Sequence, residues 1–161
     1  MLRSILYATD LGLYAPYVLQ HALSLAKAFQ SELHVVHAVE PLGLFAESVL
    51  NTYLDEKTLQ ELRSKGLTTM MASIEQRVLE GFRDEMGEAQ QDMQIVRSVR
   101  VVQGDPAQVI LDEARKLGVD LLVVGSHSHG AAHEIPLGRT AARLLQLSET
   151  PVYLVPMLQH R

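Results

Sequence analysis

The feature that most constrains the fold is a regular alternation between short apolar runs and longer stretches with an apolar residue every three or four positions. The short runs cover residues 5–8, 33–39, 121–124 and 151–155, and residues 95–103 form a further, less apolar candidate strand. Nearly unbroken apolar runs of this length are typical of strands that are buried on both faces of a sheet. The sequence therefore predicts five strands, separated by segments of a different periodicity.

The intervening segments have the spacing of one apolar helix face. The first stripe consists of Val18, Ala22, Leu25, Ala26 and Phe29. A longer stripe predicts a helix over 54–86, in which Gly66 marks a break or kink. Two shorter helices are expected over 106–117 and 137–147.

The helix over 106–117 has the clearest boundary signals. Asp105 is suited to the N-cap, Pro106 to the first helical position, and Gln108 to the partner position of a capping box. Gly118 marks its end. These residues predict where the helix starts and stops.

Strand and helix thus alternate from the first residues to the last. Short connections between alternating elements imply a parallel sheet with right-handed crossovers and helices on both faces. No stretch rich in glycine, proline or serine divides the chain, and no internal repeat is present. We expect a single domain over 1–161.

Composition excludes several function classes. A net charge of −5 argues against a general nucleic-acid binder, and the absence of cysteine excludes disulfides, thiol catalysis and cysteine metal sites. No apolar stretch approaches the ~20 residues that span a bilayer. The N-terminal segment reaches Asp10 too early for a signal peptide. We expect a cytoplasmic protein with no nucleic-acid or membrane partner.

In an open parallel sheet, ligands bind beyond the carboxyl ends of the strands, where the strand order reverses. The residues after the predicted strands are therefore informative: Thr9 and Asp10, Ala38 and Val39, and the loop that begins at Gly125. Asp10 has the strongest functional claim, because a carboxylate beside the centre of a sheet has few structural reasons to be there.

The loop 125–130 has the glycine spacing of a phosphate-binding Walker loop, but Ala131 and Ala132 replace its required lysine and hydroxyl residue. A dinucleotide-binding glycine fingerprint is absent. A hydrolase that uses Ser126 or Ser128 with a histidine is a weaker alternative, since the first glycine of a nucleophile elbow is missing. No nucleophile, base and orienting group occur together, so we do not expect this protein to be an enzyme.

The histidines form two groups. His127, His129 and His133 lie close together in the loop, and imidazole is a common metal ligand. Their spacing does not match the zinc motif H-E-x-x-H, so solvated loop residues, or residues that contact a ligand indirectly, are the favoured interpretation. His34 and His37 lie on a predicted strand and are expected to be rim or hydrogen-bonded residues.

Residues 125–140, followed by the strand at 151–155, resemble the universal stress protein family. ATP-binding members carry G-x2-G-x9-G-(S/T) at this place. Residues 5–10 are similar to the first strand and acidic residue of the family, and residues 102–106 to its turn after strand three. The resemblance covers essentially the whole chain. It implies a doubly wound five-stranded parallel sheet with strand order 3-2-1-4-5.

The glycine motif is only partly present. Gly125 and Gly138 match its first and third glycines, while Ser128 stands at the second and Arg139 at the final Ser/Thr, one position before Thr140. The nucleotide-binding residues that the resemblance implies are Ala8, Thr9, Asp10, Ala38, Val39, Gly104, Val124, Gly125, Ser128, Gly138, Arg139 and Thr140. The implied ligand is ATP or AMP, with Asp10 near a nucleotide-bound Mg²⁺ if ATP binds.

Two functions remain open at this point. Glycines let backbone N–H groups approach phosphate oxygens, and a serine at position 128 strains or crowds that approach. Arg139 compensates if its guanidinium contacts the phosphates, which leaves weakened adenine-nucleotide binding by a stress-response regulatory protein. Slow ATP hydrolysis is then an open question. The alternative is a nucleotide-independent dimeric adaptor that acts through contacts with an unknown protein partner.

The last strand has proline on both sides, at positions 151 and 156. Prolines there can protect an exposed sheet edge from pairing. The family resemblance implies instead that this edge pairs antiparallel with its copy, giving a homodimer. The residues of this edge are Val152, Tyr153, Leu154 and Val155, with alternate side chains on opposite faces.

Overall fold

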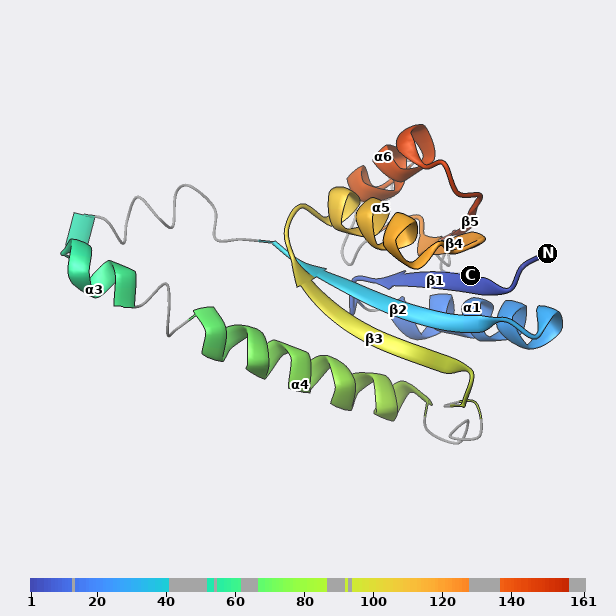
Figure 1. Ribbon diagram of the computed structural model, residues 1–161, viewed down its shortest axis with the longest axis horizontal. Helices are drawn as coiled ribbons and strands as arrows, with labels where there is room; N and C mark the ends of the chain where they lie inside the picture. Colours follow the sequence, from blue (N-terminus) through green and yellow to red (C-terminus); the bar gives the residue numbers. More distant parts are fainter. Residues whose placement is uncertain are drawn as a thin grey trace, which may run out of the picture.

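A computed structural model describes residues 1–12, 14–40, 52–53, 55–61, 67–86, 92, 94–127 and 137–156. Its centre is a five-stranded sheet of order β3-β2-β1-β4-β5 (Figure 1). The strands are β1 (Ser4–Thr9), β2 (Glu32–Val39), β3 (Val96–Gln103), β4 (Leu121–Gly125) and β5 (Val152–Val155). All neighbouring strands are parallel, so the predicted fold class and strand order are confirmed.

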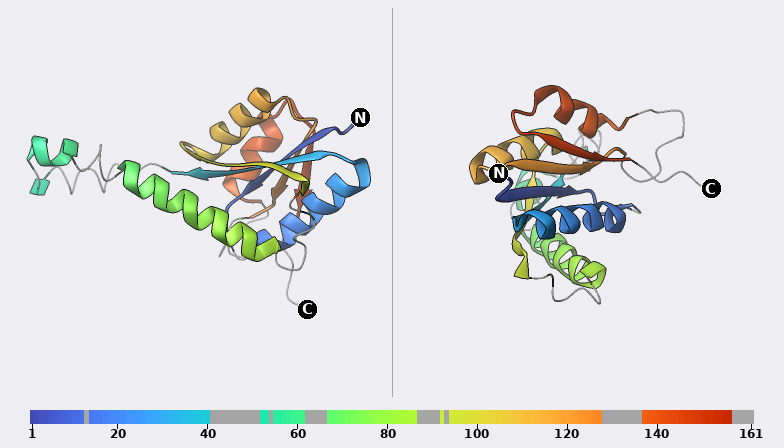
Figure 2. Two further views of the ribbon diagram at one scale, coloured as in Figure 1. Left: turned by 60° about the horizontal axis from the view of Figure 1, so that its bottom comes forward. Right: turned by 90° about the vertical axis from the view of Figure 1, so that its right-hand side faces the viewer.

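Helices cover both faces of the sheet. The helices of the chain are α1 (Ala15–Phe29), α3 (Glu56–Glu61), α4 (Leu67–Met86), α5 (Pro106–Leu117) and α6 (Arg139–Leu147), of which α3 lies away from the sheet (Figure 1). Figure 2 (right) shows α1 and α4 on one face of the sheet and α5 and α6 on the other. Within the described part of the chain, no helix combines the length and apolarity that a bilayer crossing demands.

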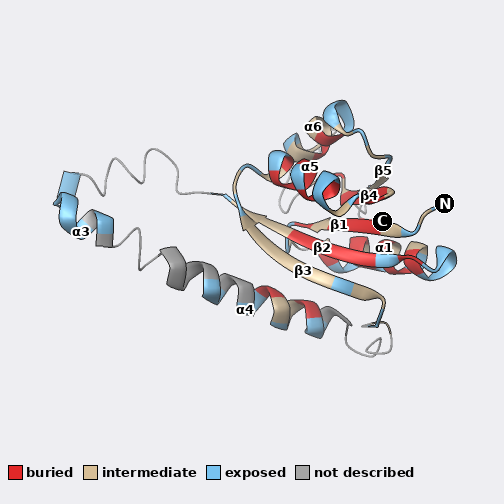
Figure 3. Ribbon diagram, in the orientation of Figure 1, coloured by how far each residue is buried: buried red, intermediate tan, exposed pale blue. Residues whose placement is uncertain are grey.

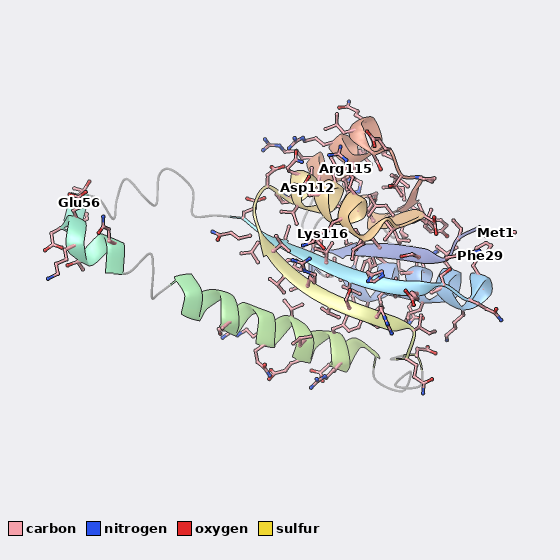
Figure 4. The ribbon with its side chains drawn as sticks, in the orientation of Figure 1. Met1, Phe29, Glu56, Asp112, Arg115 and Lys116 are labelled. Carbon is pink, nitrogen blue, oxygen red and sulfur yellow. The ribbon has the colours of Figure 1, made fainter. Side chains whose placement is uncertain are left out.

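Strand alternation divides the core into two apolar clusters. On β1, Ile5 and Tyr7 pack toward α1, whereas Leu6 packs toward α5 and α6. The centre of the sheet is more buried than β3 at its edge (Figure 3). The exposed charges Asp112, Arg115 and Lys116 belong to α5, labelled in Figure 4. Burial of apolar area on both faces is the main stabilising term in such a sheet.

The boundaries of α5 follow the sequence. The Asp105 carboxylate accepts a hydrogen bond from the Gln108 backbone N–H at 3.1 Å, and Gly118 ends the helix in the left-handed conformation. The predicted capping box is wrong in one detail, because the Gln108 side chain donates to Asp112 at 2.8 Å instead. A carboxylate one helical turn ahead offers that amide an acceptor.

The predicted helix over 54–86 is two helices, α3 and α4. Asp55 accepts a hydrogen bond from the Thr58 N–H at 2.7 Å before α3, and hydrogen bonds from the Thr58 side chain and backbone lower the pKa of Asp55. Gly66 lies outside the described residues and directly precedes α4; glycine is a poor helix former. Val78 and Phe82 from the predicted stripe are buried.

Candidate functional site

The strand order reverses between β1 and β4, which lie side by side at the centre of the sheet. A cavity of about 470 Å³ lies at the carboxyl ends of these strands. Most of the residues implied by the family resemblance line it: Ala8, Thr9, Asp10, Ala38, Val124, Gly125, Gly138, Arg139 and Thr140. Residues from four separate segments of the chain are therefore brought to one place.

Two of the implied residues do not line this cavity. The Gly104 N–H donates to the Val39 carbonyl at 2.9 Å, so these residues join the ends of β2 and β3. Gly104 has a φ of +153°, and a Cβ added to it would lie 2.8 Å from Val109 Cγ2. Glycine is thus required there by backbone conformation and space. Ser128, a further implied residue, lies outside the described residues.

The cavity has further lining residues that were not predicted to bind a nucleotide: Tyr7, Tyr14, Val18, His37, Glu40, Pro106, Ile110, Ser126, His127, Ala141 and Leu144. Most of them are within a few residues of a strand's carboxyl end or in the first turns of a helix. That position is a signal the sequence contains, but which of their side chains reach the cavity depends on packing.

One side of the cavity is lined by apolar side chains, and two of them are small. Ala8, Ala38 and Val124 belong to the sheet face that packs against α5 and α6. Pro106 and Ile110, in the first turns of α5, also line the cavity. Alanine at two of these positions leaves space that a larger aliphatic side chain would fill. This part of the cavity suits a flat apolar group.

The turn after β1 is held by its own side chains. The Gly12 N–H donates to Asp10 Oδ1 at 2.7 Å, and the Leu11 N–H donates to Thr9 Oγ1 at 3.1 Å. Leu11 has a φ of 59°, which is uncommon for a residue other than glycine. Asp10 therefore has a structural role as well, since its carboxylate forms a turn of the type that Asp favours.

The start of α6 forms another wall. The Gly138 N–H donates to the Ser126 carbonyl at 2.7 Å, and a Cβ at position 138 would lie 2.9 Å from that oxygen. Gly138 has an ordinary φ of −65°, so close approach of two backbones is what requires glycine. The predicted start at 137 shifts to Arg139, because Gly138 is the N-cap and offers no side-chain cap. Arg139 is exposed.

The histidines on β2 are hydrogen-bonded, as expected. His34 Nδ1 lies 2.7 Å from Ser98 Oγ, and His37 Nδ1 lies 2.8 Å from the Thr9 carbonyl oxygen. His127 Nδ1 is 2.8 Å from Ser126 Oγ. His129 and His133 lie outside the described residues. Among the residues that are described, no three His, Cys, Asp or Glu side chains gather as a metal site would require.

The edge strand β5 is only partly covered. Val152 and Leu154 pack toward the α5 and α6 cluster, while Val155 is buried and Tyr153 packs on the other face. Tyr153 Oη lies 2.9 Å from Nδ1 of His21 on α1. The predicted alternation of side chains along this edge is therefore present.

Comparison with known proteins gives a consistent result. The family model described as "Universal stress protein family" matches residues 1–156. Universal stress protein YxiE of Bacillus subtilis is 28% identical over 156 residues, covering 96% of this chain and 99% of YxiE.

Solved structures of similar fold extend the comparison. A structure of the protein MJ0577 aligns with a TM-score of 0.66 at 21% identity, covering 99% of both chains; the matching sequence is that of Methanocaldococcus jannaschii. A universal stress protein in complex with cAMP aligns with a TM-score of 0.56 at 16% identity, covering 96% of this chain and 97% of that one. With the family model spanning nearly every residue and the sheet order in agreement, this chain belongs to the universal stress protein family.

Proposed function

We propose that this protein is a stress-response regulatory module that binds an adenine nucleotide, ATP or AMP, in the cavity at the ends of β1 and β4. The observation that carries the proposal is that one cavity combines an apolar slot, a helix N-terminus without a side-chain cap, an arginine and a carboxylate. Its volume of about 470 Å³ is in the range of small-molecule sites.

The apolar slot is the proposed place of the adenine base. Ala8, Ala38, Val124 and Ile110 line this part of the cavity. A purine ring is flat and largely apolar on its faces, so small side chains on one wall leave room for it. Burial of its faces contributes roughly 25 cal/mol per Å² of apolar area.

The start of α6 is the proposed place of the phosphates. Amide groups in the first turn of a helix have no acceptor within the helix, and the helix dipole attracts negative charge. Gly138 leaves these groups without a side-chain cap. Arg139 stands in the cavity wall beside them and adds a planar donor that suits phosphate oxygens.

Asp10 fits the acidic partner of a nucleotide-bound Mg²⁺. Its exposed carboxylate lines the cavity, and Mg²⁺ commonly joins one carboxylate to substrate phosphates while it keeps several waters. When bound, the ion would neutralise phosphate charge. The hydrogen bond from the Gly12 N–H holds Asp10 Oδ1 in place for this role.

The remaining parts of the proposal concern the protein as a whole. We infer one domain over the chain, a cytoplasmic location and a homodimer in which β5 pairs with its copy. The partly buried apolar residues Val152 and Leu154 on an edge strand support the pairing. The universal stress protein complex with cAMP supports a nucleotide as the ligand.

Calorimetry with ATP and Mg²⁺ tests the function. We expect saturable binding by the unaltered chain, and about five- to tenfold weaker binding by Arg139→Ala, since a charge-assisted contact contributes about 1.5–3 kcal/mol before screening. Arg143→Ala is the matched control, because Arg143 lies one turn further along α6 and pairs with Asp105 at 2.8 Å. Its affinity should stay within about twofold of the unaltered chain.

Absence of heat at millimolar nucleotide would refute nucleotide binding and favour the nucleotide-independent adaptor. Equal losses in the two arginine variants would refute the role of Arg139 at the phosphates. Sedimentation of the same samples should give the mass of two chains, and a single-chain mass would refute the dimer.

A further inference from the structure

Ser126 is a buried nucleophilic side chain that the proposed function leaves unused. It directly follows β4, lines the cavity, and is 5% exposed. His127 also lines the cavity, and its Nδ1 lies 2.8 Å from Ser126 Oγ. A serine hydroxyl within hydrogen-bond reach of an imidazole is the arrangement of an activated nucleophile. The structure therefore pairs a nucleophile with a base that the sequence could not pair.

The backbone places this pair at the start of α6. The Ser126 carbonyl accepts a hydrogen bond from the Gly138 N–H at 2.7 Å, and a Cβ added to Gly138 would lie 3.3 Å from His127 Cα. Gly138 is the N-cap of α6, and Arg139 is the first residue of the helix. Because the phosphates are proposed to bind at the start of α6, Ser126 and His127 lie beside the phosphates rather than beside the base.

The surroundings of Ser126 suit the transfer of a phosphoryl group. Such transfer depends on positioning and on stabilising the negative charge of the transferred oxygens. The Arg139 guanidinium and the N–H groups of the first turn of α6 provide positive charge at this end of the cavity. Burial of Ser126 limits the access of water, which favours attack by the enclosed hydroxyl.

We propose that Ser126 accepts the γ-phosphoryl group of ATP, so that the chain phosphorylates itself at this residue. The inference rests on the proposed function and deepens it with a covalent step. Ser126 Oγ forms a bond to the γ-phosphorus, and its proton passes to Nδ1 of a neutral His127 whose own hydrogen is on Nε2. The bond from the γ-phosphorus to the bridging oxygen breaks, and its electron pair leaves with ADP.

The products are ADP and a phosphoserine, and the proton on His127 later returns to water. The phosphoserine carries a charge of about −1.5 to −2 near pH 7. This charge lies beside the start of α6, where the phosphates of a nucleotide are proposed to bind. Repulsion between like charges therefore weakens the binding of a second nucleotide, and each chain reacts once instead of turning over.

Mass spectrometry of the intact chain tests the proposal. The chain is incubated with ATP and Mg²⁺, or with AMP and Mg²⁺ as the matched ligand, because AMP has the same base but no phosphoanhydride bond. With ATP, we expect the mass to rise by one phosphoryl group, and fragmentation to place this group on Ser126. With AMP, the mass should stay unchanged.

Matched variants assign the step to the two side chains. Ser126→Ala should gain no phosphoryl group, whereas Ser148→Ala should react as the unaltered chain does, because Ser148 is the C-cap at the opposite end of α6. His127→Asn should lower the rate about a hundredfold or more, since it removes the base. His21→Asn is its control, because His21 lies on α1 outside the cavity lining. Calorimetry with AMP shows whether each variant still binds.

Three results would overturn the proposal: binding of ATP without a gain in mass, a phosphoryl group on another residue, or an unchanged rate in His127→Asn. The comparison of ATP with AMP on the unaltered chain stands even if a variant fails to fold. If neither nucleotide binds in calorimetry, the proposed function itself fails. If both bind and the mass stays constant, only the role of Ser126 fails.

Discussion

The helices α5 and α6 both begin next to a glycine at the carboxyl edge of the sheet, but the two starts are built differently. Asp105 closes the start of α5 with its own carboxylate, which accepts from the Gln108 N–H. Gly138 leaves the start of α6 without a side-chain cap and in the wall of the cavity. At a capped helix start, a side chain accepts from a backbone N–H group of the first turn. At an uncapped start, these N–H groups remain available to a ligand.

Glycine is required at positions 104 and 138 for different physical reasons. Gly104 has a φ of +153°, a conformation that side chains rarely allow. Gly138 has an ordinary φ of −65° and is required because the Ser126 carbonyl lies where a Cβ would be. The same residue type therefore serves a conformational need before α5 and a packing need before α6.

The largest loss of stability is expected for Gly104→Ala. Gly104→Ala places a methyl group 2.8 Å from Val109 Cγ2 in a strained backbone conformation. We expect the free energy of unfolding to fall by about 3 kcal/mol, from strain and overpacking together. Urea denaturation measures this change. Gly81→Ala in α4 is the control, because in the described part of the chain no atom outside its own helix backbone and its two chain neighbours lies within 4 Å of the added Cβ, and a small gain in stability is expected there.

A smaller loss is expected for Gly138→Ala. Its backbone conformation is allowed, and only the approach to Ser126 and His127 must adjust, so we expect about 1–2 kcal/mol in the free energy of unfolding. The same movement should weaken nucleotide binding at the start of α6. A loss of stability as large as that of Gly104→Ala, in the same denaturation series, would contradict the distinction between conformation and packing.

The smallest loss of stability is expected when the Asp105 cap of α5 is removed. Asp105→Ala removes the acceptor for the Gln108 N–H and the exposed ion pair with Arg143, and should cost about 1 kcal/mol. Thermal unfolding should show a midpoint lower by roughly 2–4 °C for a chain of this size. Arg143→Ala removes the ion pair alone; an equal loss in that variant would show that the cap contributes little.

The order of strands and helices could be predicted from the sequence because each element carries its own periodicity. Residues 121–124 are apolar without interruption, and the observed strand β4 is buried between helices on both faces. Asp105 and Pro106 predicted the start of α5 because caps act through neighbours in the chain. The long stripe over 54–86 was less informative, because apolar spacing alone does not distinguish one long helix from the two helices α3 and α4.

The candidate site was predictable only in part. Asp10 follows β1 and Ala38 lies near the end of β2, so both could be placed at the cavity from the fold class, whereas Val39 and Gly104 join strand ends outside it. From the sequence, His37 was expected to be a rim or hydrogen-bonded strand residue. Its contact with the Thr9 carbonyl oxygen, which links β1 and β2, is seen only in the structure. Contacts of this kind depend on register between segments that are distant in the sequence.

The amino-acid sequence by itself determined most of the elements, their order and a parallel sheet covered by helices on both faces, since periodicity and capping act over a few neighbouring residues. Only the tertiary structure decided that Gly138 meets the Ser126 carbonyl and that Asp10, His37 and Arg139 line one cavity. Which groups share a cavity depends on how strands and helices pack, and local sequence does not specify those distances.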